Sequence, residues 1–166
     1  MLDYSDVSTV IEGSKFSGPT TVHWTSWKNV GEILPLTVGQ VMIITSRSSR
    51  DRSEYLRGNL PGNPAVTISP DVPADPTTES VQELVNQISE SSPSWIIAMG
   101  GGSVLDSAKA GALLANREGT VAEYLGGSRP IEQKGLPLIA IPTTAGSGSE
   151  VTPFASITNQ SIQSKR

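Results

Sequence analysis

Three consecutive glycines and a serine, Gly100 to Ser103, stand between a short apolar run and a segment of helix-forming residues. Glycine lets the backbone take positive φ and approach a ligand closely. The first turn of a helix has N–H groups without intrahelical acceptors, at the positive end of the helix dipole. Anions, phosphate above all, bind at such a point. The segment therefore predicts a strand that leads into a phosphate-binding turn.

A second glycine-rich loop, T-T-A-G-S-G-S-E, follows another apolar run and covers Thr143 to Glu150. Gly146 and Gly148 allow a tight turn there. One such loop is often only a turn that needs positive φ, and neither loop is a G-x-G-x-x-G or P-loop motif. Two of them at neighbouring strand ends favour a nucleotide or another phosphate compound, because ligands of open parallel sheets lie there. The hydroxyl donors of the second loop are Thr143, Thr144, Ser147 and Ser149.

Ionisable side chains near these loops have both functional and structural interpretations. Asp106 either bonds loop amides or a cofactor group, or is a first-turn acid favoured by the helix dipole. Lys109 either reaches the same site or is solvated, and the solvated interpretation is favoured. Glu150 either orients its loop by accepting backbone N–H bonds or is a surface acid. His23, the single histidine, is interpreted as a hydrogen-bonded structural residue, since metal sites usually need two or three imidazoles.

Length and composition are typical of a globular protein with one core. The 166 residues suffice for one domain. The net charge is -4 with Lys and Arg scattered, so we expect no nucleic-acid partner. The chain has no cysteine, and no apolar stretch approaches the roughly 18 residues that span a bilayer. The acidic first residues do not resemble a signal peptide, and we expect a cytoplasmic location without a membrane partner.

The elements that must position the two loops alternate along the chain. Apolar runs predict strands at residues 20–24, 40–45, 65–68, 95–99 and 136–142, and those at 40–45 and 136–142 are expected to be buried on both faces. Apolar spacing of three and four residues predicts helices near 27–34, 53–60, 76–92 and 104–116. Asp75 is expected to cap the third helix, with Pro76 as its first residue. This alternation predicts an α/β fold with a doubly wound, mostly parallel sheet.

Three motifs carry a family resemblance. They are G-G-G-S-V-L-D-S-A-K at Gly100 to Lys109, L-P-L-I-A-I-P-T-T-A-G-S-G-S-E-V-T at Leu136 to Thr152, and I-T-N at Ile157 to Asn159. Together they resemble the N-terminal half of iron-containing (group III) alcohol dehydrogenases. The resemblance implies a Rossmann-like dinucleotide-binding domain. In the family an all-helical domain follows, with a divalent metal, usually iron or zinc, in the cleft between the two.

The resemblance also implies where a cofactor would bind. The pyrophosphate would contact Gly101, Gly102 and Ser103, and Asp106 would lie beside the nicotinamide end of the cleft. The adenosine and phosphate path would be lined by Thr143, Thr144 and Ser147, and Lys165 would reach the adenosine ribose. Asp75-Pro76-Thr77 stands where the family usually has Asn-Pro-Thr, so an amide contact is not available there.

Ser46, which follows the strand at 40–45, bears on the choice of cofactor. NAD-preferring relatives usually have an aspartate there, bonded to the adenosine ribose, and an aspartate would repel a 2′-phosphate. Because serine does not, and because Arg47 and Arg50 are close by, the sequence predicts a preference for NADP(H) over NAD(H). The alternative is that both arginines are solvated loop residues.

The metal ligands of the family lie downstream of the region that this chain resembles. We therefore expect residues 1–166 to be the dinucleotide-binding domain of a truncated enzyme, without catalytic residues or metal ligands of its own. The intact enzyme would be a homo-oligomer that transfers hydride between nicotinamide and an alcohol or aldehyde. Alternatives are a glycerol dehydrogenase, a maleylacetate reductase, a dehydroquinate-synthase-like lyase, or a non-catalytic nucleotide-binding or structural module.

Overall fold

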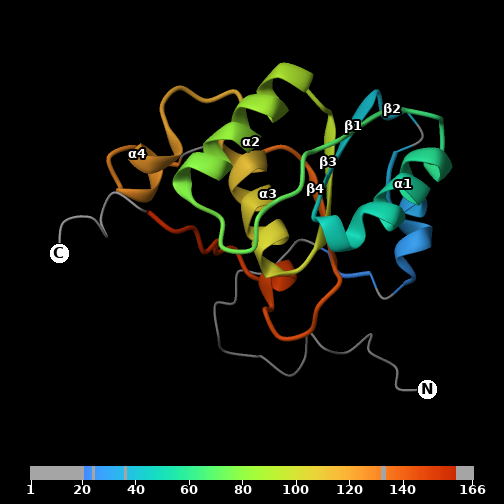
Figure 1. The fold of residues 1–166 in the computed structure, drawn as a ribbon. Coiled ribbons are helices and arrows are strands. Elements are labelled where there is room, and N and C mark those ends of the chain that lie inside the picture. Colours follow the sequence, from blue (N-terminus) through green and yellow to red (C-terminus); the bar gives the residue numbers. More distant parts are fainter. Residues whose placement is uncertain (1–20, 24, 36, 132–133, 160–166) are drawn as a thin grey trace, which may run out of the picture.

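Four parallel strands form the centre of the structure (Figure 1). The computed structural model describes residues 21–159, apart from 24, 36 and 132–133. The sheet has the order β2-β1-β3-β4. In its register, Val41 lies beside Trp95 and Ile97 beside Ile139. The strands are β1 (Gln40–Thr45), β2 (Ala65–Ile68), β3 (Trp95–Gly100) and β4 (Leu138–Pro142), so the first three lie where the sequence predicts them.

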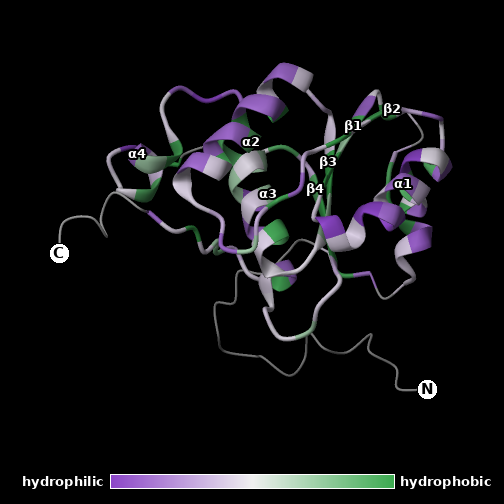
Figure 2. Ribbon diagram, viewed as in Figure 1, coloured by the Kyte–Doolittle hydropathy of each residue, from purple (hydrophilic) through white to green (hydrophobic). Residues whose placement is uncertain are grey.

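Alternate side chains of the two central strands enter two separate cores, because successive residues of a strand point to opposite faces. One core joins Val41, Ile43, Ile97 and Met99 to Val30, Leu34, Leu56 and Leu60. The other joins Met42, Ile44, Ile96 and Ala98 to Leu84, Ile88, Val104, Leu105 and Ala108. Each fully buried valine, leucine, isoleucine or methionine side chain contributes about 1.5–3 kcal/mol to the free energy of unfolding. Figure 2 shows the apolar strands enclosed between helices whose outer faces are hydrophilic.

Helices cover both faces of the sheet, which confirms the doubly wound, Rossmann-like prediction. One face carries the 3₁₀ helix η2 (Trp27–Glu32) and α1 (Arg50–Asn59), which follows the short η3 (Arg47–Ser49). The other carries α2 (Thr78–Ser91) and α3 (Gly102–Leu114), with the unpredicted α4 (Val121–Leu125) packed on them (Figure 1). Among the described residues, no helix is long and apolar enough to cross a bilayer.

Helix α2 begins two residues later than predicted, because Thr77 and not Asp75 is its N-cap. The Thr77 hydroxyl accepts a hydrogen bond from the Ser80 N–H at 3.2 Å, and the Ser80 hydroxyl accepts one from the Thr77 N–H at 2.9 Å. Pro76 stays outside the helix because its carbonyl accepts a bond from the Thr158 N–H at 2.9 Å. The predicted apolar stripe is buried, at Val81, Leu84, Val85 and Ile88.

One predicted strand is absent from the described residues, and another is found but is less buried than expected. Residues 21–23 are irregular and exposed, because no strand among the described residues pairs with them; residues 20 and 24 lie outside the described residues. His23 is accordingly exposed, not a hydrogen-bonded structural residue, within the part of the chain that is described. Strand β4 starts at Leu138 and is half-buried, because it is the last strand of the described sheet and has a neighbour on one side only.

Candidate functional site

The strand order reverses between β1 and β3, which is the point where ligands of open α/β sheets bind. From β1 the chain first adds β2 on one side and then β3 on the other. The Thr45 hydroxyl at the end of β1 donates to the Met99 carbonyl of β3 at 3.1 Å. This bond joins the two strand ends, so the glycines that follow β3 start directly beside the end of β1.

Close packing, and not positive φ, is what requires the three glycines. Gly101 is the N-cap of α3 with φ -80°, and none of the three has positive φ. A Cβ on Gly101 would lie 3.1 Å from the Thr144 hydroxyl oxygen, and one on Gly102 would lie 2.9 Å from Ser147 Cβ. The glycines therefore let the second loop lie directly against the start of α3.

In the structure the second loop extends beyond the Thr143–Glu150 motif. It begins where β4 ends and covers residues 143–156, and the name is used for this whole segment from here on. Its Thr143 N–H donates to the Gly100 carbonyl at 2.9 Å, so the parallel pairing of β3 and β4 continues into the loops. Gly146 and Gly148 have φ values of 107° and 63°, which confirms the predicted turn. The structure brings together residues that the sequence predicts as cofactor contacts, namely Gly101, Gly102, Thr144 and Ser147.

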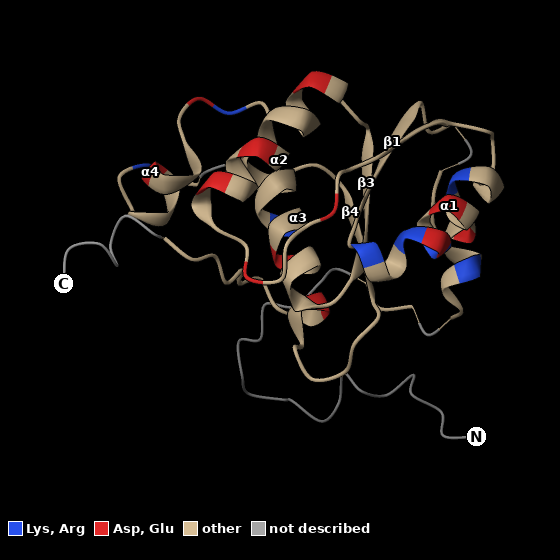
Figure 3. Cartoon of the chain, viewed as in Figure 1, with Lys and Arg blue, Asp and Glu red and all other residues tan. Residues whose placement is uncertain are grey.

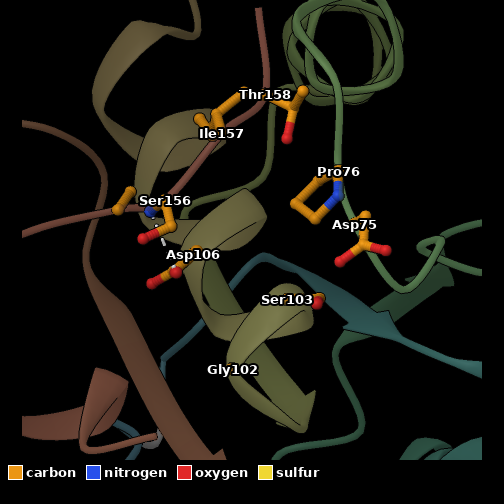
Figure 4. Close-up of a pocket in the computed structure, with 9 residues that line it drawn as sticks. Asp75, Pro76, Gly102, Ser103, Asp106, Ser156, Ile157 and Thr158 are labelled. Carbon is orange, nitrogen blue, oxygen red and sulfur yellow. Dashed lines mark hydrogen bonds between the residues drawn. The ribbon is translucent and has the colours of Figure 1, made fainter.

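A cavity of about 500 Å³ opens at the start of α3 (Figure 4). The N-cap residue Gly101 has no side chain to cap this helix, and its carbonyl accepts the N–H groups of Val104 and Leu105. Within the described residues, the N–H groups of Gly102 and Ser103 remain available at the positive end of the helix dipole. The cavity is lined by Gly102, Ser103 and Asp106 of α3, by Asp75 and Pro76, and by residues 155–158. In Figure 4, Asp75 and Asp106 lie on opposite sides of it, with Ser103 between them. The start of α3 therefore favours an anion, whereas the two carboxylates at the cavity would favour the polar or cationic parts of a ligand.

Asp106 and Lys109 join α3 to the second loop. The Asp106 carboxylate accepts hydrogen bonds from the Ser149 hydroxyl at 2.6 Å and from the Ser156 N–H at 3.0 Å, and it pairs with the Lys109 ammonium at 2.9 Å. That ammonium also donates to the carbonyls of Ser149 at 3.0 Å, Thr152 at 3.3 Å and Phe154. The interpretation of Lys109 as solvated is wrong, since these carbonyls surround the ammonium and its side chain is only 18% exposed.

The pKa of Asp106 lies below its ordinary value. Burial raises it, but the hydrogen bonds from Ser149 and Ser156 and the charge of Lys109 lower the pKa by more. The carboxylate is therefore ionised at neutral pH and the adjacent ammonium balances its charge. This pairing removes the repulsion that Asp106 would otherwise exert on an anion at the start of α3, and leaves Asp75 as the second acidic residue of the cavity.

The residues after β1 only partly match the expectation that Arg47 and Arg50 bind the 2′-phosphate of NADP(H). The Ser46 hydroxyl lies 3.1 Å from that of Ser48, and Arg47 is exposed. The Arg50 guanidinium, however, donates to Asp71 at 2.7 Å and to the Ser69 carbonyl at 3.1 Å. Figure 3 shows basic residues on the side of the sheet that carries η2, η3 and α1, whereas the charged residues of α2 are acidic. Of the two arginines, only Arg47 has no ion pair within the described residues.

Sequence reasoning gave no role to residues 155–158, which form one wall of the cavity. The Thr78 N–H donates to the Thr158 carbonyl at 3.1 Å, in an isolated parallel bridge that follows the Thr143–Ser156 loop. The I-T-N tripeptide was the available signal, but its partner lies about eighty residues earlier in the chain.

Glu150 is half-buried, and its Oε2 atom has no hydrogen-bond partner among the described residues. Lys165 lies outside the described residues.

A metal site is not formed by the residues that the structure describes. Among them, no three side chains of His, Asp or Glu gather where they could hold an ion. The acidic side chains at the cavity, Asp75 and Asp106, face each other across it, and Asp106 already accepts three bonds within the chain. These residues therefore do not fit a catalytic metal, and no step of a reaction is derived through one.

The fold and the cavity together define the class of protein. An open parallel sheet with helices on both faces, and a glycine-flanked helix start at its switch point, is a Rossmann-like α/β domain of the nucleotide-binding type. The sequence profile of the family "Iron-containing alcohol dehydrogenase" matches residues 19–166. The chain belongs to this family.

Individual relatives agree with the family. The chain is 46% identical over 90 residues to long-chain-alcohol dehydrogenase 1 of Geobacillus thermodenitrificans, which covers 53% of this chain and 23% of that enzyme. The sulfoacetaldehyde reductase of Bifidobacterium kashiwanohense, solved in complex with NAD+, is similar with a TM-score of 0.69 at 31% identity. That similarity covers 82% of this chain and 36% of the reductase.

A third relative is the NADH-dependent butanol dehydrogenase A of Thermotoga maritima. It has a TM-score of 0.70 at 26% identity, over 82% of this chain and 35% of that enzyme. This chain therefore spans roughly a quarter to a third of the length of the relatives described here.

Proposed function

We propose that this chain is the nucleotide-binding part of a metal-dependent, NAD(P)-linked alcohol dehydrogenase or aldehyde reductase. In that enzyme hydride would pass between the nicotinamide ring and the carbon that bears the alcohol or carbonyl oxygen of a small substrate. The observation that carries the proposal is the cavity at the uncapped start of α3, between Gly102 and Ser103 and the second loop. The family membership and the short share of each relative that the chain covers support it.

Binding of nucleotides to the 166-residue chain tests this proposal. Thermal unfolding is measured with ADP, NADH or NADPH, and at 100 times the dissociation constant a ligand should add about 2.7 kcal/mol to the free energy of unfolding. Adenosine at the same concentration is the control, because it lacks the phosphates that the helix start would bind. If none of the three nucleotides raises the melting temperature, the proposed function is overturned.

The chain alone should bind nucleotide without catalysing hydride transfer. Its described residues do not form a site that could hold a metal ion. An aldehyde-reduction assay with NADH or NADPH, run with and without added Zn²⁺ or Fe²⁺, should therefore give no turnover. Turnover that depends on either cation would show that a catalytic site is present in the chain, against this part of the proposal.

The cofactor preference that we propose is for NADP(H). It rests on Ser46, which leaves room for a 2′-phosphate, and on the exposed Arg47; Arg50 would have to leave Asp71 before it could take part. Competition titrations should show tighter binding of NADPH than of NADH. The variant Ser46→Asp should reverse that order by placing a carboxylate beside the 2′-position. Equal or tighter binding of NADH to the unaltered chain would contradict the preference.

A further inference from the structure

Asp106 and Lys109 lie three residues apart on α3 and are both largely enclosed, with side chains only 14% and 18% exposed. An enclosed ion pair has a desolvation penalty that its mutual attraction often fails to offset. The pair is therefore not explained by stability alone. What distinguishes it is that nearly all of its remaining hydrogen bonds go to one segment, the second loop.

The Lys109 ammonium and the Asp106 carboxylate already make most of the hydrogen bonds that they can form, and they make them within the chain. An ammonium has three N–H donors, and Lys109 has one carboxylate and three loop carbonyls around it. Both oxygens of Asp106 accept bonds, one from Ser149 and Lys109 and the other from the Ser156 N–H. Lys109 therefore has no donor left for a ligand, and Asp106, which lines the cavity, already uses three of the roughly four acceptor positions of a carboxylate within the chain.

The bonds from this pair determine where one wall of the cavity lies. Residues 155–158 form that wall. Hydrogen bonds attach it at two points, and between them Ile157 packs on an apolar cluster that includes Val81 of α2 and Ala110 of α3. Its far end is fixed by Thr158, which pairs with the backbone at Pro76 and Thr78. Its near end is fixed by the bond from the Ser156 N–H to Asp106 at 3.0 Å. Ile157 packs beside Ala110 and Leu114, in the later part of α3, so the bond from Ser156 to Asp106 is the hydrogen bond that holds the wall close to the start of α3.

We propose that Asp106 and Lys109 are a positioning pair, which holds the second loop and the 155–158 wall against α3 so that the cavity has the shape its ligand needs. This inference rests on the proposed function, since the ligand is taken to be a nicotinamide dinucleotide. The pair acts on the part of the site that lies beyond the start of α3, where Asp106 and Ser156 meet. Loss of the pair should therefore weaken the binding of a dinucleotide such as NADH more than the binding of ADP, which has no group beyond its phosphates.

Binding of NADH and of ADP to the full chain tests the pair. Asp106→Asn, Lys109→Met and the double variant remove the charges singly and together, and Ser149→Ala removes one loop bond while the ion pair stays. We expect NADH to bind at least tenfold more weakly to Lys109→Met and about threefold more weakly to Ser149→Ala, with ADP changed less than threefold in both. Because the two charged residues act as one unit, the double variant should lose less than the product of the single losses.

Lys28→Met is the matched control, because it removes the same charge from an exposed lysine that lies over Trp27 and Tyr55, on the opposite face of the sheet. It should leave NADH binding within twofold. Hydrogen exchange of segment 149–156 supplies a readout without ligand, and Lys109→Met and Ser149→Ala should increase it. Lys109→Met leaves the Asp106 carboxylate without its partner and could therefore unfold the chain. Ser149→Ala keeps the ion pair and the double variant leaves no charge behind, so both can be tested even if Lys109→Met does not fold.

Several results would overturn the positioning pair. Unchanged NADH binding in folded Ser149→Ala and Lys109→Met is one, and equal losses of NADH and ADP, which would indicate general damage, is another. Weaker NADH binding without any change in hydrogen exchange would mean that Lys109 contacts the ligand directly. If the unaltered chain binds no nucleotide, the proposed function fails separately. The exchange data then decide whether the pair holds the loop.

Discussion

Gly102 packs closely against Ser147 of the second loop. An alanine there would place its Cβ 2.9 Å from Ser147 Cβ and 3.3 Å from the Ser147 hydroxyl oxygen, so the loop would have to move. Overpacking of this kind costs about 1–3 kcal/mol. We expect Gly102→Ala to weaken NADH binding at least fivefold, as measured by titration, although alanine is a better helix former than glycine.

The partner residue supplies the control for this prediction. Gly102→Ala combined with Ser147→Gly removes the clash and should restore most of the lost affinity. Gly58→Ala introduces the same change on α1, where the added Cβ would have no atom within 4 Å apart from its own helix backbone and chain neighbours. It should leave NADH binding unaltered. Unchanged affinity in Gly102→Ala, or no recovery in the double variant, would contradict the packing role of Gly102.

Asp106 makes stability depend on pH in a predictable direction. Its pKa is lower in the folded chain than in the unfolded chain, so its contribution is complete above the unfolded pKa of about 3.9 and is lost as the pH falls through the folded value. Glu79 and Glu123, whose pKa values are also lowered, mainly by backbone hydrogen bonds, add to the loss in acid. The free energy of unfolding should therefore fall as the pH is lowered toward 3.

Asp106→Asn isolates the contribution of this carboxylate. Compared with the unaltered chain, the variant should be less stable near pH 7, and the difference should shrink as the pH falls below about 4. Urea unfolding at several pH values between 3 and 7 measures it. A difference that stays constant over this interval would show that the ionised form of Asp106 is not what the fold stabilises.

At the scale of single elements, the start of α2 illustrates how a tertiary contact chooses between two possible caps. Thr77 and Ser80 bond reciprocally, while the backbone on either side of Thr77 pairs with Thr158. We expect Thr77→Ala to lower the free energy of unfolding by about 1 kcal/mol, the usual effect of losing a cap. Denaturant unfolding measures the change. Thr77→Ser keeps the hydroxyl and should lose much less, and equal losses in both variants would mean that the hydroxyl is not responsible.

The central strands show what local pattern alone can establish. Strands β1 and β3 are continuous apolar runs flanked by polar residues, and they form where the runs lie, buried on both faces. Strand β4 has the same kind of run, yet it is half-buried. A run of apolar residues indicates a strand that can be buried, but the number of neighbouring elements decides whether it is.

For the whole molecule, β4 leaves an apolar strand at the edge of the described sheet. The Ile96 N–H bonds the Pro137 carbonyl and the Thr143 N–H bonds the Gly100 carbonyl, so in a regular parallel ladder Leu138 and Ala140 present their backbone groups to the open side. Unpaired edges of this kind pair with other chains. We predict that the 166-residue chain self-associates with rising concentration, which sedimentation velocity would show.

Ala140→Pro tests whether this edge is responsible, because proline removes an N–H that points away from β3. The variant should stay monomeric at concentrations where the unaltered chain associates, with a melting temperature close to that of the unaltered chain. Gly39→Ala, in open space ahead of β1, is a control that should leave association unchanged. A chain that is monomeric throughout, or association that Ala140→Pro leaves intact, would contradict the prediction.

The sequence by itself determined the alternation of β1 to β4 with α1 to α3, the parallel α/β architecture and the two loops that face the site. These follow from short-range patterns: the apolar periods of strands and helices, the glycines of the loops, and motifs that are contiguous in the chain. Residues such as Gly101, Gly102, Thr144 and Ser147 could be found in this way because their types are unusual for their positions.

The tertiary structure alone decided what several of these residues do. The glycines after β3 are needed because the second loop packs on them, and Lys109 is enclosed by carbonyls up to 45 residues away. Asp106 accepts a bond from a residue 50 positions later, and Thr77 caps α2 beside a strand segment from the end of the described chain. The physical reason is the same in each case: hydrogen-bond partners and close contacts between distant segments are set by how the sheet brings its loops together, and no local pattern records them.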